Sequence, residues 1–225
     1  MTSDNRTLVI MAKAPRPGCV KTRLAESVPP EAATELYVCL LNDTITLAQA
    51  LDHVETAIMC PTSDVEDLSR AVPETADIVA QTGQGLAAGL DSVFNHFAGR
   101  AQRRVIAFNS DSPHLPASVL EAAFDVLESS DLVVGPTHDG GYYLVGATAP
   151  HPGLFTDNAM GTESALEALL TRARALGLST HLTDPFYDID IAADLHQLAD
   201  ELQCMPGKAP RTANWLSNRR SAGCK

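Results

Sequence analysis

The stretch Leu8-Val-Ile-Met-Ala-Lys-Ala-Pro-Arg-Pro-Gly-Cys-Val-Lys-Thr-Arg-Leu24 joins a short apolar run to a loop that is rich in cations. The run from Leu8 to Ala12 has the length of a buried strand, and two prolines and a glycine follow it closely. Clustered cations repel one another unless an anion lies among them, and both arginine and lysine bind phosphate. We therefore predict a phosphate-binding loop at the carboxyl end of the first strand, with a solvated basic turn as the alternative. The cations of this loop are Lys13, Arg16, Lys21 and Arg23.

The size of the chain suits one large domain. It has 225 residues, of which 45% are hydrophobic. We find no linker, repeat or low-complexity run before the basic C-terminal end. We therefore expect a single domain over residues 1–204, followed by a basic tail over residues 205–225. We expect this tail to be solvated, as chain ends usually are.

Charge and cysteine content restrict the partners and the compartment. The formal net charge is −12, so the surface should repel nucleic acid and anionic membranes. No apolar run approaches the roughly 20 residues that cross a bilayer, and the N-terminus lacks signal-peptide character. The five cysteines are scattered and form no C-x-x-C pair, which argues against a disulfide framework or a zinc site. We expect a cytoplasmic protein that binds neither nucleic acid nor membrane, and the oligomeric state stays open.

Strand-like and helical patterns alternate along the chain. This alternation indicates an α/β fold with a doubly wound, mostly parallel sheet. Ligands bind at the carboxyl ends of the strands in such sheets, so we expect the functional residues on that rim. The predicted strands cover 8–12, 54–60, 77–81, 104–109, 132–134, 142–146 and 179–183, and the predicted helices cover 31–51, 64–71, 86–97, 117–128, 163–176 and 191–202.

Acidic residues near the strand ends suggest a metal site. Asp111 follows the most apolar predicted strand, where a carboxylate is poorly placed for packing. Asp188 and Asp190 lie two residues apart in an extended segment, so their side chains point the same way. Asp111 and Asp190 together would clamp a divalent metal, which takes few protein carboxylates and fills its shell with water and phosphate oxygens. The alternative is that Asp111 or Ser110 caps the turn or the following helix, and that Asp190 caps the last helix.

Two glycine-containing turns are candidates for contacts to small molecules. In the segment His138-Asp-Gly-Gly-Tyr-Tyr143, Gly140 and Gly141 permit close backbone approach. Asp139 could hold an acceptor hydroxyl or take its proton, and a simple Asp-Gly turn is the alternative. Gln81 and the turn at Gly85 could receive a base or ribose.

Several enzyme classes are disfavoured by missing motifs. The sequence contains no Gly-x-Ser-x-Gly elbow, no Gly-x-Gly-x-x-Gly and no Gly-x-x-x-x-Gly-Lys-Ser/Thr. A serine hydrolase of the elbow type, a dinucleotide oxidoreductase and a P-loop ATPase are therefore poor matches.

Four motifs together resemble a bacterial and archaeal family of glycosyltransferases, the nucleotide-diphospho-sugar transferases, some of which are linked to arsenosugar biosynthesis. The order of the motifs is also similar to that of the phospholactate guanylyltransferases and, more distantly, of the molybdenum-cofactor guanylyltransferases. The resemblance runs from Leu8 to about Leu202. The motifs are Met11-Ala-Lys-Ala-Pro-Arg-Pro-Gly-Cys-Val-Lys-Thr-Arg-Leu24, Ser110-Asp-Ser-Pro-His-Leu115, Gly135-Pro-Thr-His-Asp-Gly-Gly-Tyr-Tyr-Leu-Val-Gly146 and Asp188-Ile-Asp190.

The resemblance implies a single-domain, GT-A-type, Rossmann-like fold with a mostly parallel mixed sheet between helices. It also implies Mg²⁺ or Mn²⁺ on Asp111 and Asp190. The segment from Asp139 to Tyr142 is implied to face the acceptor. One departure is that Gly83-Gln-Gly-Leu-Ala-Ala-Gly89 lacks a Glu-Arg pair that relatives often carry. The residues implied to grip the nucleotide phosphates are Lys13, Lys21 and Arg23.

We expect a metal-dependent transferase that uses an activated nucleotide and a small-molecule acceptor. The favoured form is a glycosyltransferase with a nucleotide-sugar donor, in which Asp111, Asp139 and Lys21 carry the chemistry. The alternative is a guanylyltransferase-like nucleotidyltransferase, which joins a nucleoside monophosphate to a phosphorylated acceptor and releases pyrophosphate. A non-catalytic nucleotide sensor is the third reading, motivated by the missing Glu-Arg pair.

Overall fold

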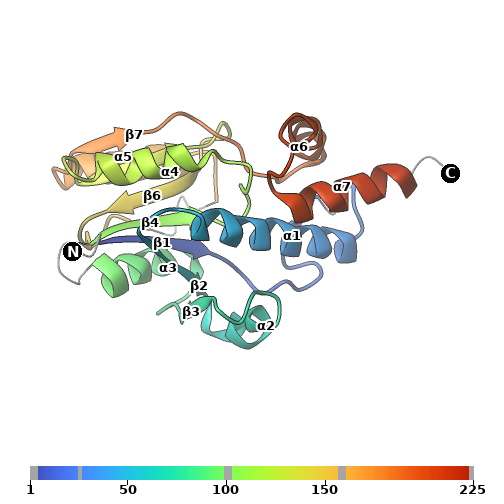
Figure 1. Ribbon diagram of the computed structural model, residues 1–225. Helices are drawn as coiled ribbons and strands as arrows, with labels where there is room; N and C mark the ends of the chain where they lie inside the picture. Colours follow the sequence, from blue (N-terminus) through green and yellow to red (C-terminus); the bar gives the residue numbers. More distant parts are fainter. Residues whose placement is uncertain (1–4, 25–26, 99–102, 157–160, 223–225) are drawn as a thin grey trace.

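A twisted sheet between two layers of helices forms the centre of the protein (Figure 1). The computed structural model describes residues 5–24, 27–98, 103–156 and 161–222. Within these ranges the strands are β1 (Arg6–Met11), β2 (Val54–Cys60), β3 (Asp77–Ala80), β4 (Arg104–Asn109), β5 (Leu132–Pro136), β6 (Tyr142–Ala147) and β7 (Thr180–Leu182). The helices are α1 (Pro30–Gln49), α2 (Val65–Ser69), α3 (Gly85–Val93), α4 (Ala117–Val126), α5 (Ala165–Ala175), α6 (Ala192–Cys204) and α7 (Pro210–Ala222), with a 3₁₀ turn at Thr62–Asp64 and a π-helical turn at Phe94–Ala98.

The order of the strands in the sheet is β3-β2-β1-β4-β6-β5-β7. β6 pairs antiparallel with β4 and β5, and the other neighbouring pairs are parallel. β1 therefore lies between two parallel neighbours, with Ile10 opposite Ile58 on one side and Phe108 on the other. Both β1 and β4 are buried along their central residues, which explains why each reads as a continuous apolar run. The expected mixed, mostly parallel sheet is confirmed.

The two faces of the sheet carry different helices. α1 and α4 cover one face, where Leu41 and Phe124 pack against β1 and β4. α3 and α5 cover the other face, with Leu90 and Leu169 in a second apolar cluster. α1 begins with Pro30, a residue that suits the first helical turn because its missing N–H would have no partner there. This layering leaves the carboxyl rim of the parallel strands open for side chains from the loops.

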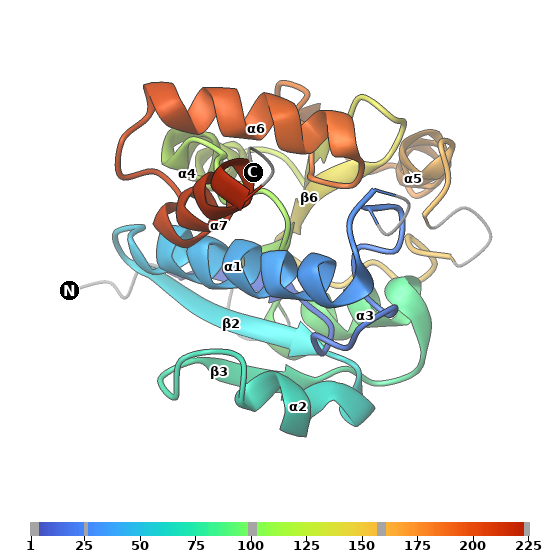
Figure 2. The same ribbon diagram turned by 90° about the vertical axis from the view of Figure 1, so that its right-hand side faces the viewer.

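α6 and α7 pack together beside α1, with α7 next to α1 and α6 above both in Figure 2. The expectation of a solvated C-terminal tail is wrong for the described residues, because α7 is a helix that packs on α1. Its N-terminal turn is held by Asp43, whose side chain is fully buried. The carboxylate of Asp43 accepts hydrogen bonds from the backbone N–H of Thr212 and from its hydroxyl, both at 2.8 Å. Ala209 and Leu216 complete the contact as buried apolar residues.

The predicted strands and most predicted helices agree with the structure within a few residues. The segment predicted as a helix over 86–97 changes from α-helix to a π-helical turn at Phe94. The predicted edge strand is confirmed as β7, whose residues are exposed. Among the described residues no helix is both long and apolar enough to cross a bilayer. Cys19, Cys39, Cys60 and Cys204 are free thiols.

Candidate active site

A pocket of about 740 Å³ opens where β1, β3 and β4 end. Because β1 and β4 are parallel neighbours, the loops that follow them leave the same edge of the sheet side by side. The strand order also changes direction at this pair, which is where open α/β sheets form a crevice for ligands. The predicted residues that line this pocket are Lys13, Lys21, Arg23, Gln81, Gly85, Asp111 and Asp190.

The basic loop is anchored at both ends, which holds Lys13, Lys21 and Arg23 at the pocket. The backbone N–H of Ala14 donates to Asp64 at 2.9 Å, and Val20 and Leu24 are buried. Lys21 has a φ of 50°, in the left-handed region that non-glycine residues seldom adopt. The side chain of Lys21 lines the pocket, and only 3% of this side chain is exposed.

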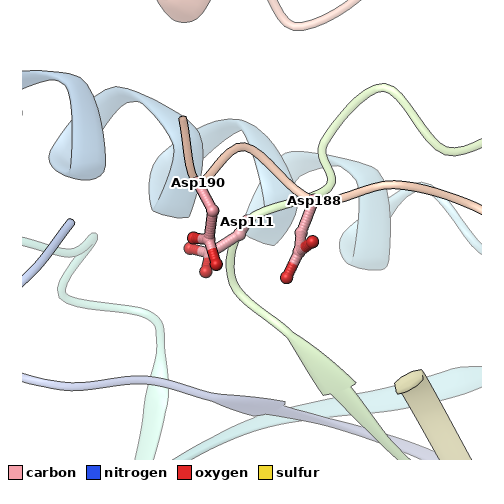
Figure 3. A group of neighbouring side chains, drawn as sticks. All are labelled: Asp111, Asp188 and Asp190. Atoms are coloured by element: carbon pink, nitrogen blue, oxygen red, sulfur yellow. The ribbon is translucent and has the colours of Figure 1, made fainter. Parts of the chain in front are cut away.

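Three carboxylates lie close together at the carboxyl rim of the sheet (Figure 3). One oxygen of each of Asp111, Asp188 and Asp190 lies within 4.8 Å of the others. Asp111 follows β4, whereas Asp188 and Asp190 lie on the segment before α6. Asp194 fixes that segment, since its carboxylate accepts the backbone N–H groups of Asp190 and Ile191 at 2.8 Å. Asp190 does not take the capping role that was its alternative, because Ile191 is the N-cap residue of α6 and the Asp190 carboxylate accepts from Lys21 and Arg23 instead.

The charges of the cluster are only partly balanced. Lys21 Nζ lies 2.8 Å from Asp111 Oδ2 and 3.1 Å from Asp190 Oδ1. Burial by itself lowers the pKa of Lys21, but the two carboxylates outweigh it and the net pKa lies above the usual value. Burial, together with the neighbouring carboxylates of Asp190 and Asp111, raises the pKa of Asp188 to about 6. A divalent cation suits this donor set, because hard cations prefer carboxylate oxygens and the third carboxylate carries uncompensated charge.

A second pocket, of about 370 Å³, adjoins the first. Asp190 and Arg23 line both pockets, whereas Asp111 lines the first and Asp188 the second. The carboxylate cluster thus lies on the boundary between two cavities, one rich in cations and one that contains the predicted acceptor segment. The second pocket is also lined by Asn109, Thr137, Asp139, Gly141, Tyr142, Thr162 and Glu163.

Asp139 is held as a charged group. Its Oδ1 accepts a 2.5 Å hydrogen bond from the Thr137 hydroxyl and a 3.2 Å bond from the Gly141 N–H. Its Oδ2 lies 3.9 Å from Arg23. The Thr137 bond, with help from Gly141 and Arg23, lowers the pKa of Asp139. A carboxylate with a lowered pKa is a weak base, so the geometry favours an orienting role over proton abstraction.

Gly140 departs from the expectation of an acceptor contact, since it is not among the residues that line the second pocket. Its φ is +86°, and a Cβ at this position would collide with the backbone carbonyl of Glu163. The carbonyl of Gly140 accepts the N–H of Leu166 at 2.9 Å. The glycine is needed because the turn passes directly under the start of α5.

Arg16 is a second departure. Its guanidinium lies 2.8 Å from Asp64 and 2.7 Å from Asp67, and it does not line the large pocket. Instead of facing the pocket, Arg16 anchors the loop to the segment around α2. Gln81 does line the pocket, but its amide nitrogen donates to the carbonyls of Gly83 and Gly85, which fixes that turn.

Sequence reasoning missed Asp188 as a member of the cluster, although its spacing from Asp190 indicated a shared direction. It also missed Tyr37 of α1, which lines the large pocket. The Tyr37 hydroxyl accepts the N–H of Lys13 at 3.0 Å and the Ser110 hydroxyl at 3.4 Å. This tyrosine thereby connects the basic loop to the residue before Asp111. No local motif marks such a role, because it depends on a contact between distant segments.

A family model matches residues 44–162, just over half of the chain, and is described as "Uncharacterized protein conserved in bacteria (DUF2064)". The matched segment includes β4 with Asp111 and the turn with Asp139. The basic loop and the Asp188–Asp190 segment lie outside it.

The chain is similar to a guanylyltransferase in sequence and to several solved structures in fold. The phosphoenolpyruvate guanylyltransferase of Sphaerobacter thermophilus is 28% identical over 196 residues, which cover 86% of this chain and 93% of that protein. A protein from Desulfovibrio desulfuricans G20, described as a nucleotide-diphospho-sugar transferase, has a TM-score of 0.85 at 24% identity and covers 97% of this chain and 96% of its own. Rv0371C from Mycobacterium tuberculosis H37Rv, solved in complex with manganese, has a TM-score of 0.50 at 19% identity and covers 88% of this chain and 100% of its own. The two structural matches bear out the expected fold.

Proposed function

The chain belongs to the family described as "Uncharacterized protein conserved in bacteria (DUF2064)", and we propose that it is a metal-dependent nucleotidyltransferase. It is a transferase with the nucleotide-diphospho-sugar transferase fold. In the proposed reaction, a phosphate oxygen of a small acceptor attacks the α-phosphorus of a nucleoside triphosphate. The new bond joins acceptor oxygen to α-phosphorus, the bond from α-phosphorus to the bridging oxygen breaks, and pyrophosphate leaves.

The observation that carries this proposal is the position of the carboxylate cluster between two adjoining pockets. The larger pocket holds Lys13, Lys21 and Arg23 near the cluster, which suits the charge of a triphosphate. The smaller pocket holds Asp139 and Tyr142 on the other side, where an acceptor would approach. In-line displacement at phosphorus needs the nucleophile and the leaving group on opposite sides of the reacting atom. An acceptor in the smaller pocket and a triphosphate in the larger pocket would approach the cluster from two sides, as this geometry requires.

The residues of the chain act mainly by positioning charge. Lys13 and Arg23 would bind the β- and γ-phosphates, and so stabilise the negative charge that develops on departing pyrophosphate. Asp111, Asp188 and Asp190 would hold Mg²⁺ or Mn²⁺, which when bound neutralises phosphate oxygens and lowers the barrier by several kcal/mol. Asp139 would orient the acceptor and Arg23. A phosphate acceptor requires no proton removal at neutral pH, which agrees with the lowered pKa of Asp139.

Glycosyl transfer from a nucleotide-sugar, favoured from the sequence, ranks second. A relative that covers 86% of this chain is named as a phosphoenolpyruvate guanylyltransferase. The transferase from Desulfovibrio desulfuricans shares 24% identity and supports the fold alone. The missing Glu-Arg pair, which motivated a non-catalytic sensor, lies in the turn that Gln81 stabilises through its own hydrogen bonds.

Release of pyrophosphate tests the proposal directly. The protein is incubated with each nucleoside triphosphate, Mg²⁺ or Mn²⁺, and a panel of phosphorylated acids that includes phosphoenolpyruvate. We expect pyrophosphate and a nucleotidylated acceptor in equal amounts, with guanosine triphosphate as the first donor to try. Release of nucleoside diphosphate from nucleotide-sugars would favour the second candidate. Tight nucleotide binding without product from any donor would favour the sensor.

A variant at Asp111 tests the role of the cluster. Asp111→Asn keeps the size of the side chain but removes a metal-binding charge, so we expect pyrophosphate release to fall by about 100-fold or more while the fold persists. Asp77→Asn is the matched control, because Asp77 is exposed at the start of β3, away from the carboxyl rim. Wild-type turnover in Asp111→Asn would remove this carboxylate from the mechanism.

A further inference from the structure

The ammonium of Lys21 lies inside the carboxylate cluster. Its distances of 2.8 Å to Asp111 and 3.1 Å to Asp190 are those of direct ion pairs, and 3% of its side chain is exposed. The two carboxylates that would hold a divalent ion therefore already hold a monovalent cation that belongs to the chain. A buried ion pair of this kind is costly to break unless both charges find new partners.

Lys21 and a divalent ion compete for the carboxylates of Asp111 and Asp190. Mg²⁺ approaches carboxylate oxygens to about 2.0–2.1 Å, and the Lys21 ammonium lies 2.8 Å from Oδ2 of Asp111. Two cations on one oxygen in a partly buried site repel each other strongly, since the low local dielectric weakens screening. A metal that binds through Asp111 Oδ2 and Asp190 Oδ1 therefore displaces the Lys21 ammonium, and a metal on the other two oxygens still meets its charge at close range.

The fixed backbone of the loop and the neighbouring cations limit where the displaced Lys21 ammonium can lie. The backbone of Lys21 lies between the buried residues Val20 and Leu24, so rotation of the long side chain is easier than displacement of the loop. Lys13 and Arg23 line the same cavity, and their positive charges disfavour a further cation there while the cavity is empty of anions. A nucleotide phosphate among these three residues would provide the new partner.

We infer that the Lys21 ammonium occupies the metal site before ligands bind. When a nucleotide enters, this ammonium moves from Asp111 and Asp190 to the nucleotide phosphates. Nucleotide and divalent metal then bind with positive coupling. The nucleotide phosphates give the displaced Lys21 ammonium a new partner, and the metal gives Asp111 and Asp190 a new cation. The coupling is reciprocal, as linkage requires. This inference rests on the metal and nucleotide sites of the proposed function.

Metal binding without nucleotide gives the first test. The Mn²⁺ dissociation constant is measured by electron paramagnetic resonance of free Mn²⁺ for the wild type, Lys21→Met and the control Lys13→Met. Lys13 lines the same pocket but is exposed. We expect Lys21→Met to bind Mn²⁺ about tenfold tighter or more than the wild type, since loss of one charged interaction of this size changes affinity tenfold. We expect Lys13→Met to stay close to the wild type. Unchanged or weaker Mn²⁺ binding by Lys21→Met would overturn the inference, and so would the same gain in both variants.

A second measurement uses the wild-type protein and does not depend on the folding of a variant. The ¹H–¹⁵N signal of the Lys21 ammonium is followed by NMR, because a buried, ion-paired ammonium exchanges its protons slowly enough to be seen. We expect the signal to shift when Mg²⁺ and guanosine triphosphate are added together, and to shift much less with the same concentration of Mg²⁺ alone. A signal that stays in place with both ligands at saturation would refute the exchange.

These measurements separate the inference from the proposed function. They record binding, so they can succeed in a protein that releases no pyrophosphate, which would count against the nucleotidyltransferase alone. Conversely, pyrophosphate release with a Lys21 signal that never moves would leave the proposed function standing and remove the exchange.

Discussion

Asp188 is the carboxylate of the cluster with the least favourable surroundings. The ion pairs of Lys21 run to Asp111 and Asp190, and burial with these two neighbours raises the pKa of Asp188 to about 6. In an unfolded chain the pKa is about 3.9. The folded protein therefore prefers a protonated Asp188, so the penalty of its charge grows as the pH rises from about 4 to 6 and is complete above that range.

We predict that Asp188→Asn stabilises the metal-free protein at neutral pH. The free energy of unfolding should rise by about 1–2 kcal/mol at pH 7.5, after allowance for the partial exposure of this side chain, and by much less at pH 4.5. Urea unfolding in the presence of EDTA at the two pH values checks this. An equal effect at both values would show that the charge of Asp188 is not the cause.

At this scale, the predicted residues that the structure brings to the large pocket share one property. Lys13 and Asp111 lie at the ends of central strands, and the rim of a parallel sheet gathers such positions whatever the rest of the fold does. Arg16 could not be separated from Lys21 in sequence, because the choice between a phosphate and Asp64 depends on where α2 lies. The role of Tyr37 was out of reach for the same reason.

Among the elements, α7 is anchored at its first turn by one buried carboxylate. Its first turn donates to Asp43, a carboxylate buried on α1, through the backbone and hydroxyl of Thr212. Arg211 adds its backbone N–H and a guanidinium contact at 3.2 Å to the same carboxylate. Negative charge at a helix N-terminus is also favoured by the helix dipole.

We predict that Asp43→Asn loosens α7. Loss of charged hydrogen bonds should lower the free energy of unfolding by about 2–3 kcal/mol, and trypsin should cleave faster after Lys208 and Arg211. Limited proteolysis with mass spectrometry checks both sites, and Asp52→Asn serves as the control because Asp52 is exposed beyond the end of α1. Wild-type cleavage rates in Asp43→Asn would show that apolar packing alone holds the helix.

Sequence analysis found the other helices but not α7, and the physical reason lies in its composition. The helix has few apolar residues, so it lacks the stripe of apolar positions that marks a surface helix. Its cations suggested a solvated end, whereas the interaction that holds it starts from an acid far away in the sequence. A buried carboxylate inside a predicted helix, such as Asp43, is the signal that could have indicated a missing partner.

On the scale of the whole molecule, the order of the strands decides where the site lies. Alternation of strands and helices was sufficient to predict a mostly parallel sheet, but not that β6 lies between β4 and β5. That insertion places the turn with Asp139 on the same rim as Asp111, since β5 runs parallel to β4 on the far side of β6. The acceptor segment therefore meets the carboxylate cluster through topology rather than through sequence proximity.

The central claim is that the basic loop and the carboxylate cluster act on the same nucleotide through one bound cation. The most direct measurement is a crystal structure grown with Mn²⁺ and an α,β-methylene analogue of guanosine triphosphate, which cannot release pyrophosphate. The account predicts an anomalous Mn²⁺ peak among Asp111, Asp188 and Asp190, with a phosphate oxygen of the analogue on the ion and the Lys21 ammonium on the triphosphate. A nucleotide bound away from this cluster, or a Mn²⁺ peak elsewhere with Lys21 still on Asp111, would contradict it.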